Sequence, residues 1–116
     1  MTDKIKTGNK GEELAANFLI NKGYEIVARN YRYKHAEIDL IVKKETLLVF
    51  VEVKTRSSTV FGEPESFVTP KKAAKVLEGA EQFMIENDWH GNIRFDIISV
   101  KTGSTFLIDH FEDAFH

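Results

Sequence analysis

Charged residues interrupt the two most apolar stretches of the sequence. Residues 47–53 read Leu-Leu-Val-Phe-Val-Glu-Val, which is typical of a strand covered on both faces. Glu52 and Lys54 share one face of that strand because side chains alternate. If the preceding stretch forms an antiparallel hairpin with a loop of two or four residues, Asp39 joins this face, opposite Glu52 or one diagonal away.

Two carboxylates so close together repel each other, and desolvating them is costly unless a cation lies between them. Glu12 offers a third carboxylate, because at 100° per residue it lies within about 60° of Ala15 and Leu19 on the apolar face of a predicted helix. Oxygen ligands without Cys or His suit Mg²⁺ or Mn²⁺. Lys54 could orient or deprotonate a water, or stabilise phosphate charge. The constellation predicts phosphodiester hydrolysis.

Each of these residues also has a purely structural interpretation. Asn9 and Glu12 have nearly the spacing of a helix capping box. Glu52 and Lys54 could form a plain ion pair at a strand end. Asp96 is interpreted as structural, paired with a neighbour on its own strand. The histidines lack metal-ligand spacing and are expected at the surface or at edges, namely His35, His90, His110 and His116.

Length and composition limit the function classes. A chain of 116 residues with 42% apolar and 29% charged residues predicts a single domain, residues 1–116, with one core. The absence of Cys excludes thiolate metal sites and a cysteine nucleophile. A net charge of -2 requires any nucleic-acid surface to be a local basic patch. No membrane-spanning or targeting segment is recognisable, so we expect a soluble cytoplasmic protein that does not bind membranes.

The elements that must position these residues follow from periodicity and turn signals. Apolar helical spacing, ended by a glycine, predicts a first helix, and Thr69-Pro70 opens a second. Runs of β-branched and aromatic residues predict five strands. The expected order αβββαββ means an α/β fold, a mixed central sheet flanked by helices. The ranges are helices 10–22 and 69–87, strands 24–30, 37–43, 46–54, 93–100 and 105–110, and a loop 57–67 beside the site.

Two basic clusters are candidates for binding nucleic acid. Lys71, Lys72 and Lys75 open the second predicted helix, where the helix dipole disfavours cations unless an anion is bound. A solvated helix face is the alternative. Arg29, Arg32 and Lys34 alternate with tyrosines, as in single-strand binders. A hairpin edge charged against aggregation would look the same. Arg56 completes the candidate set.

The linked motifs resemble a known nuclease family. Asp39, twelve intervening residues and Glu52-Val53-Lys54 are similar to the PD-(D/E)xK signature, and the chain resembles the bacterial YraN-like (UPF0102) family. The resemblance implies a restriction-endonuclease-like three-layer core similar to that of archaeal Holliday-junction resolvases. The resembling stretches are Gly11-Glu12, Gly23-Tyr24, Arg29-Asn30, 37–41, 49–56, 94–96 and Ala114-Phe115.

The same resemblance implies the roles of the site residues. Glu12, Asp39 and Glu52 would be metal ligands, with Val53 among the metal-contacting positions, and Lys54 would be the catalytic lysine. The family usually has glycine before its Glu-Ile-Asp, whereas this chain has Ala36.

We therefore expect a nuclease that depends on Mg²⁺ or Mn²⁺ and acts on DNA, with branched or single-stranded DNA among its substrates. A catalytically silent DNA-binding module or partner subunit with the same fold is the alternative, and a protein-interaction domain is the third. DNA is the expected partner. A homodimer and a DNA-processing protein partner are both compatible with the sequence.

Overall fold

The computed structural model describes residues 3–57 and 69–115, with side chains from residue 10 onward in the first range. Seven elements follow one another in the predicted order αβββαββ. The predicted loop 57–67 lies outside the described residues except for Ser57. The elements are α1 (Asp3–Asn21), β1 (Glu25–Tyr33), β2 (Ala36–Lys44), β3 (Leu47–Ser57), α2 (Pro70–Glu86), β4 (Asn92–Thr102) and β5 (Leu107–Phe111).

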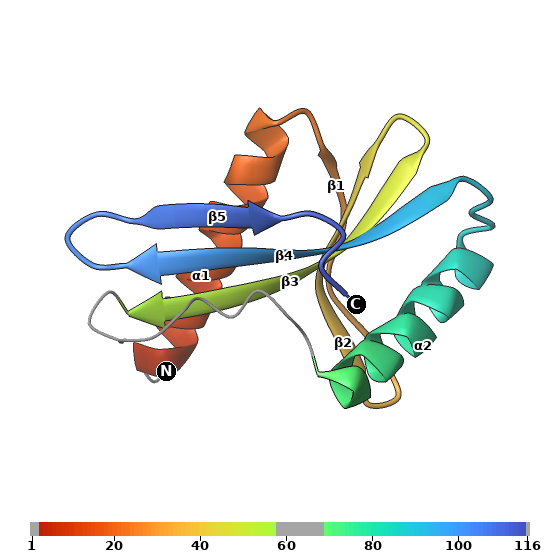
Figure 1. The fold of residues 1–116 in the computed structure, drawn as a ribbon, viewed down its shortest axis with the longest axis horizontal. Coiled ribbons are helices and arrows are strands. Elements are labelled where there is room, and N and C mark those ends of the chain that lie inside the picture. Colours follow the sequence, from red (N-terminus) through yellow and green to blue (C-terminus); the bar gives the residue numbers. More distant parts are fainter. Residues whose placement is uncertain (1–2, 58–68, 116) are drawn as a thin grey trace.

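The strands form one mixed five-stranded sheet in the order β1-β2-β3-β4-β5 (Figure 1). β3 and β4 are parallel, and the other neighbours are antiparallel. Lys44 pairs with Leu47, so the β2–β3 turn has two residues, and its first residue, Glu45, has a φ of 56°. Asp39 and Glu52 were predicted to share a face of the sheet if this loop has an even number of residues. The two-residue turn confirms that prediction.

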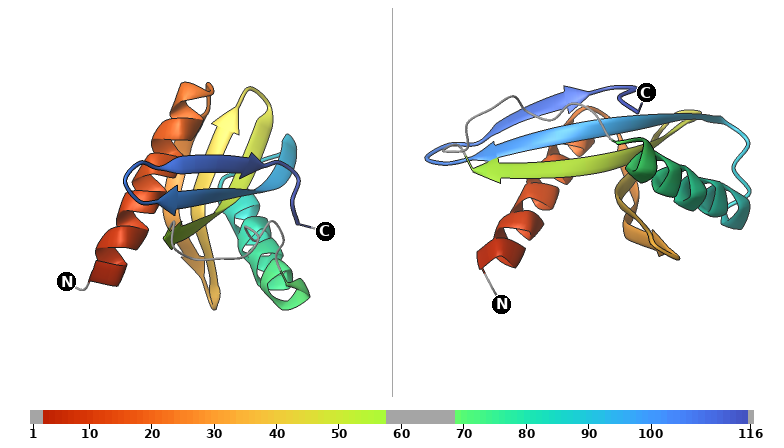
Figure 2. Two further views of the ribbon diagram at one scale, coloured as in Figure 1. Left: turned by 60° about the vertical axis from the view of Figure 1, so that its left-hand side comes forward. Right: turned by 60° about the horizontal axis from the view of Figure 1, so that its bottom comes forward.

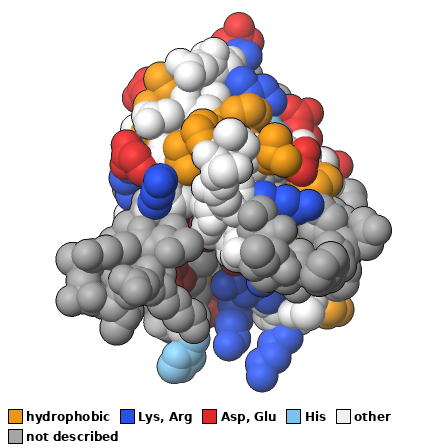
Figure 3. All heavy atoms as spheres, turned by 90° about the vertical axis from the view of Figure 1, so that its left-hand side faces the viewer, with side chains coloured by type: hydrophobic (Ala, Val, Ile, Leu, Met, Phe, Trp, Pro, Cys, Tyr) orange, Lys and Arg blue, Asp and Glu red, His pale blue; other side chains and the backbone are white. Residues whose placement is uncertain are grey.

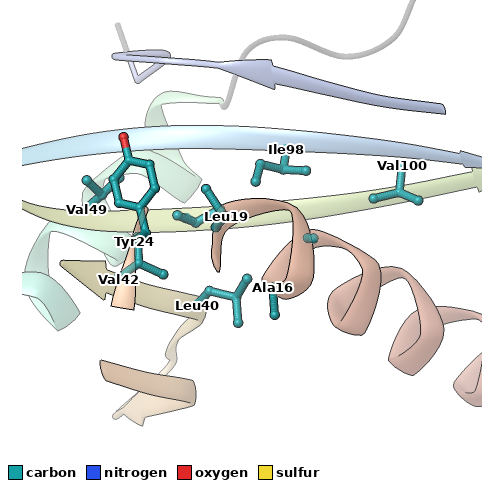
Figure 4. Close-up of a cluster of buried hydrophobic side chains, with 10 residues drawn as sticks. Ala16, Leu19, Tyr24, Leu40, Val42, Val49, Ile98 and Val100 are labelled. Atoms are coloured by element: carbon teal, nitrogen blue, oxygen red, sulfur yellow. The ribbon is translucent and has the colours of Figure 1, made fainter. Parts of the chain in front are cut away.

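The two helices cover opposite faces of the sheet, which gives three layers (Figures 1 and 2). α1 packs on the face that carries Val49 and Val51, and α2 packs on the face that carries Leu48 and Phe50. Figure 4 shows the first of these cores, in which the fully buried Leu19 of α1 lies among strand side chains. The fold is therefore the mixed α/β sheet flanked by helices that the sequence predicts.

The helix starts show one correct and one incorrect prediction. The Thr69 side chain accepts a hydrogen bond from the Lys72 N–H at 3.2 Å and Pro70 opens α2, as predicted. α1 begins at Asp3 instead of residue 10, so Asn9 lies inside the helix. The capping-box interpretation of Asn9 and Glu12 is therefore wrong, because a capping residue must precede the first helical turn.

A buried polar network holds the C-terminal strands together. Asp96, which is fully buried, accepts hydrogen bonds from Arg94 Nε at 2.8 Å, from the Asp113 N–H at 3.0 Å and from His110 Nε2 at 2.7 Å. The ion pair with Arg94 confirms the predicted pairing of Asp96 with a neighbour on its own strand. His110 lies on the edge strand β5, one of the two places predicted for it. It is not a surface residue, because its side chain is only 3% exposed and belongs to this network.

Ala36 occupies the position where the family usually has glycine. Its backbone has no positive φ, and it is buried at the start of β2. A Cβ added at Gly79 of α2 would lie 3.1 Å from the Cβ of Ala36. The alanine methyl is therefore accommodated because the facing helix position has no side chain.

Apolar side chains gather on one face of the molecule among charged ones (Figure 3). Phe106 and Leu107, near the β4–β5 turn, are exposed, and Phe106 also borders a hollow of about 250 Å³ between α1 and β5.

Within the described ranges, no helix is both long and apolar enough to cross a membrane.

Candidate active site

The candidate site lies where the sheet forks between β2 and β3. Their pairing ends at Leu40 and Val51, beyond which β3 pairs only with β4, as far as Ser57. In the other direction along the chain, β2 pairs only with β1, as far as Ala36. Figure 1 shows the two strands diverging there, with the first turn of α2 nearby. Asp39 and Glu52 are the first residues past the last pair.

Asp39 bridges the fork. Its Oδ2 accepts a hydrogen bond from the Val53 N–H at 2.7 Å, so a side chain links the strands where their backbone pairing has stopped. Burial raises the pKa of Asp39 above its ordinary value, the Val53 N–H lowers it, and the Glu37 carboxylate raises it further. Val53 contributes this backbone hydrogen bond to the site, and its side chain packs on the core.

Glu52 follows the buried Phe50 by two residues and therefore points to the same side of β3, toward α2. Its side chain is 16% exposed. Burial and the Asp39 carboxylate raise the pKa of Glu52 to about 7, although Lys72 and Lys54 lower it. Asp39 and Glu52 are thus close enough to resist simultaneous ionisation.

This shift predicts a pH-dependent gain in stability for Glu52→Gln. Folding favours the protonated carboxyl, so wild type has full stability below the ordinary pKa of 4.5 and loses stability as the pH rises to about 7. In EDTA, we expect the variant to be about 2–3 kcal/mol more stable at pH 8 and equal near pH 4.5. Urea unfolding at both pH values measures this. Glu81→Gln, on an exposed position of α2, is the control; a difference independent of pH contradicts the account.

Glu12 follows the point at which α1 packs tightly against β3. Gly11 is buried against Thr55, and a Cβ added at Gly11 would overlap the Thr55 side chain. Burial and the Asp39 carboxylate raise the pKa of Glu12, and a hydrogen bond from the Asn30 side chain lowers it. Asn30 has a φ of 52° within β1 and was not assigned a role from the sequence.

Replacing Gly11 with alanine is expected to push α1 away from β3. Overpacking against Thr55 costs about 2–3 kcal/mol, the upper part of the usual range because the added Cβ would overlap the Thr55 hydroxyl. The better helix propensity of alanine returns about 1 kcal/mol, so a net loss of about 1–2 kcal/mol is expected. Chemical denaturation measures it. Combining the change with Thr55→Ala should recover most of the loss, and a fully stable Gly11→Ala protein would show that the close approach is unimportant.

The three predicted carboxylates are coupled electrostatically through Asp39, which raises the pKa of both Glu12 and Glu52. In the part of the chain that the structure describes, no three His, Cys, Asp or Glu side chains are already arranged to hold a metal ion. The chemistry of these side chains nevertheless fits Mg²⁺ or Mn²⁺. All the donor atoms are oxygens, and the partly buried carboxylates of Asp39 and Glu52 repel each other unless a cation is bound.

Two lysines lie within electrostatic reach of these carboxylates. Lys54, predicted as the catalytic lysine, lowers the pKa of both Asp39 and Glu52. Lys72, predicted only as a nucleic-acid contact, lies closer to the site than expected, with its Nζ 3.7 Å from Glu52 Oε1. Lys71 and Lys75 are exposed on α2. No sequence signal separated Lys72 from its neighbours, because its position depends on how α2 docks.

The basic residues of the β1–β2 hairpin have acidic partners. Their ion pairs are Arg29–Glu13 at 2.9 Å, Arg32–Glu37 at 3.6 Å and Lys34–Glu78 at 3.7 Å. These three ion pairs favour the interpretation of the hairpin as a charged edge, because each of its cations already has a counter-charge.

The remaining candidate, Arg56, lies on β3, four residues after Glu52.

Comparisons with known proteins place the chain in a family. A UPF0102 protein of Flavobacterium psychrophilum is 47% identical over 100% of this chain and 98% of its own length, and one of Flavobacterium johnsoniae is 43% identical over the same shares. Among solved structures, Pyrococcus furiosus SfsA in complex with Ca²⁺ is similar with a TM-score of 0.40 and 13% identity, over 97% of this chain and 65% of that chain. The family model described as "Uncharacterised protein family UPF0102" matches residues 11–100, and the chain therefore belongs to this family.

Proposed function

We propose that the protein is a Mg²⁺- or Mn²⁺-dependent endonuclease that hydrolyses DNA phosphodiesters, with branched recombination or repair intermediates as its substrate class. The observation that carries the proposal is the pair of partly buried carboxylates at the sheet fork, Asp39 and Glu52, with the Lys54 ammonium within electrostatic reach. The sequence resemblance to PD-(D/E)xK nucleases and to junction resolvases supports the reaction and the substrate class.

Each residue has a distinct task in this proposal. Asp39 and Glu52 would hold the metal with Glu12 and the backbone at Val53, and the Val53 N–H fixes the direction of the Asp39 carboxylate. A bound metal would stabilise charge on the phosphate and lower the pKa of a coordinated water. The Lys54 ammonium would orient the attacking water by donating a hydrogen bond, or stabilise the charge that develops on the phosphate.

The exposed lysines of α2 supply a surface for the DNA backbone. Lys71 and Lys75 lie in the first turns of the helix, whose N–H groups and dipole favour phosphate oxygens. Both are on the element that also brings Lys72 to Glu52. A phosphate held at this helix end would therefore lie near the carboxylates, and DNA binding should weaken with salt.

The experiment is a cleavage assay with labelled four-way junctions, flaps, single strands and plain duplex, each with Mn²⁺, Mg²⁺ or EDTA. We expect cleavage with Mn²⁺ or Mg²⁺ and none in EDTA. Glu52→Ala, purified identically, controls for a contaminating nuclease. Salt-sensitive DNA binding without cleavage under any metal condition would overturn the enzyme and favour the silent binding module, and cleavage in EDTA would overturn the metal dependence.

A further inference from the structure

Lys72 is placed at the site by the way α2 starts. Thr69 caps the helix by accepting a hydrogen bond from the Lys72 N–H at 3.2 Å, and Pro70 fixes the first turn. The Lys72 Nζ then lies 3.7 Å from Glu52 Oε1, and the side chains of Lys72 and Glu52 are 42% and 16% exposed. A mostly buried carboxylate of the site is thus paired with a half-exposed ammonium from outside the sheet.

Lys72 is also the stronger of the two counter-charges. It lowers the pKa of Asp39 more than Lys54 does, and it lowers the pKa of Glu52 more than Lys54 does. Lys54 is the lysine of the nuclease-like motif on β3, whereas Lys72 comes from α2, so the two cations belong to different elements. Part of the positive charge that faces the carboxylates therefore comes from α2.

We propose that Lys72 is an internal counter-ion of the Asp39–Glu52 pair and that a divalent cation displaces its ammonium from Glu52. The inference rests on the proposed function, because it assumes that these carboxylates bind the metal. A single ion pair of a half-exposed lysine is weak, whereas a divalent ion contacts several oxygens at once. Metal affinity is therefore lower than it would be without Lys72, because the Lys72–Glu52 ion pair must break before the metal ion binds Glu52.

An incidental surface ion pair is the competing explanation, and the two differ in what happens to metal affinity. If Lys72 competes with the metal for Glu52, removing its charge strengthens metal binding. If Lys72 only stabilises α2, its removal leaves metal affinity unchanged or weakens it. Lys71 is the matched control, because it is the neighbouring residue of the same helix turn and is exposed.

The first test is a calorimetric Mn²⁺ titration of wild type, Lys72→Met, Lys72→Arg and Lys71→Met. We expect Lys72→Met to bind about 3–5-fold more tightly than wild type, the upper part of the range of an exposed ion pair. Lys71→Met should stay within about twofold, and Lys72→Arg should not gain, since it keeps the charge. Equal affinities of Lys72→Met and Lys71→Met would overturn the displacement.

The second test needs no metal and separates the two proposals. In EDTA at pH 8, melting temperatures of wild type, Lys72→Met, Glu52→Gln and the double variant form a cycle, and we expect a coupling of about 2 °C or more. Zero coupling would overturn the counter-ion role even if Mn²⁺ binds. A second outcome is coupling between Lys72 and Glu52 in a protein whose Mn²⁺ titration is unaffected by Asp39→Asn. That outcome would overturn the metal site and the displacement, and would confirm only the counter-ion.

Discussion

Glu52→Ala is expected to lower the rate of DNA cleavage on the order of 10³-fold, which corresponds to about 4 kcal/mol of transition-state stabilisation. The variant loses one of the two proposed metal ligands on the strands. Asp39, the other strand ligand, cannot position the metal ion by itself. The folded state should not suffer, because Glu52 and Asp39 repel each other in the metal-free protein. Single-turnover cleavage of a four-way junction at saturating Mn²⁺ measures the loss.

The matched control removes a carboxylate from the exposed face of α2. Glu81→Ala should cleave at the wild-type rate, because Glu81 is exposed and outside the site. Thermal unfolding of both variants in EDTA checks that they are folded. Cleavage by Glu52→Ala within about tenfold of wild type would contradict the assignment of Glu52 as a metal ligand.

Asp96→Ala is expected to lower the free energy of unfolding by about 3–5 kcal/mol, since the donors of Arg94, His110 and Asp113 lose their buried acceptor, although Arg94 keeps an ion pair with Glu112 at 3.5 Å. Asp96 is fully buried, and its carboxylate accepts hydrogen bonds from Arg94, His110 and the Asp113 N–H. Burial alone would raise the pKa of Asp96, but these hydrogen bonds together lower it below its ordinary 3.8. Urea unfolding at pH 7 measures the loss.

The lowered pKa also fixes the pH dependence of this contribution. The carboxylate stabilises the fold fully above pH 3.8, and the stabilisation is lost as the pH falls through the lower folded value. Asp109→Ala, at an exposed position on β5, is the control and should stay within about 0.5 kcal/mol of wild type. An equally small effect of Asp96→Ala would show that the network contributes little.

The order of the elements could be predicted because the strands are short runs of β-branched and aromatic residues, and the turns β1–β2 and β2–β3 have two residues each. The residues at which the elements begin and end could not be predicted. Asn30 and the charges after it indicated the end of the first strand, yet β1 continues to Tyr33 with Asn30 at positive φ. Asn9 indicated a helix start, yet α1 runs through it from Asp3. In both places tertiary structure overrode weak local preferences.

The site was predictable to the extent that periodicity determines it. Strand alternation gave the shared face of Asp39 and Glu52, and helical spacing gave the side of α1 that carries Glu12. Alternation cannot say where two strands separate, so the fork and the hydrogen bond from the Val53 N–H to Asp39 were not foreseen. The contact between Lys72 and Glu52 joins residues twenty positions apart on different elements, and only the docking of α2 creates it.

The most direct test of the central claim is a calorimetric Mn²⁺ titration of wild type against Asp39→Asn at pH 7.5, with Glu81→Gln as the control. The account predicts saturable binding by wild type and Glu81→Gln, and none by Asp39→Asn, because Asp39 is the carboxylate that couples to both Glu12 and Glu52. Superimposable isotherms for all three proteins would contradict the metal site on which the nuclease depends.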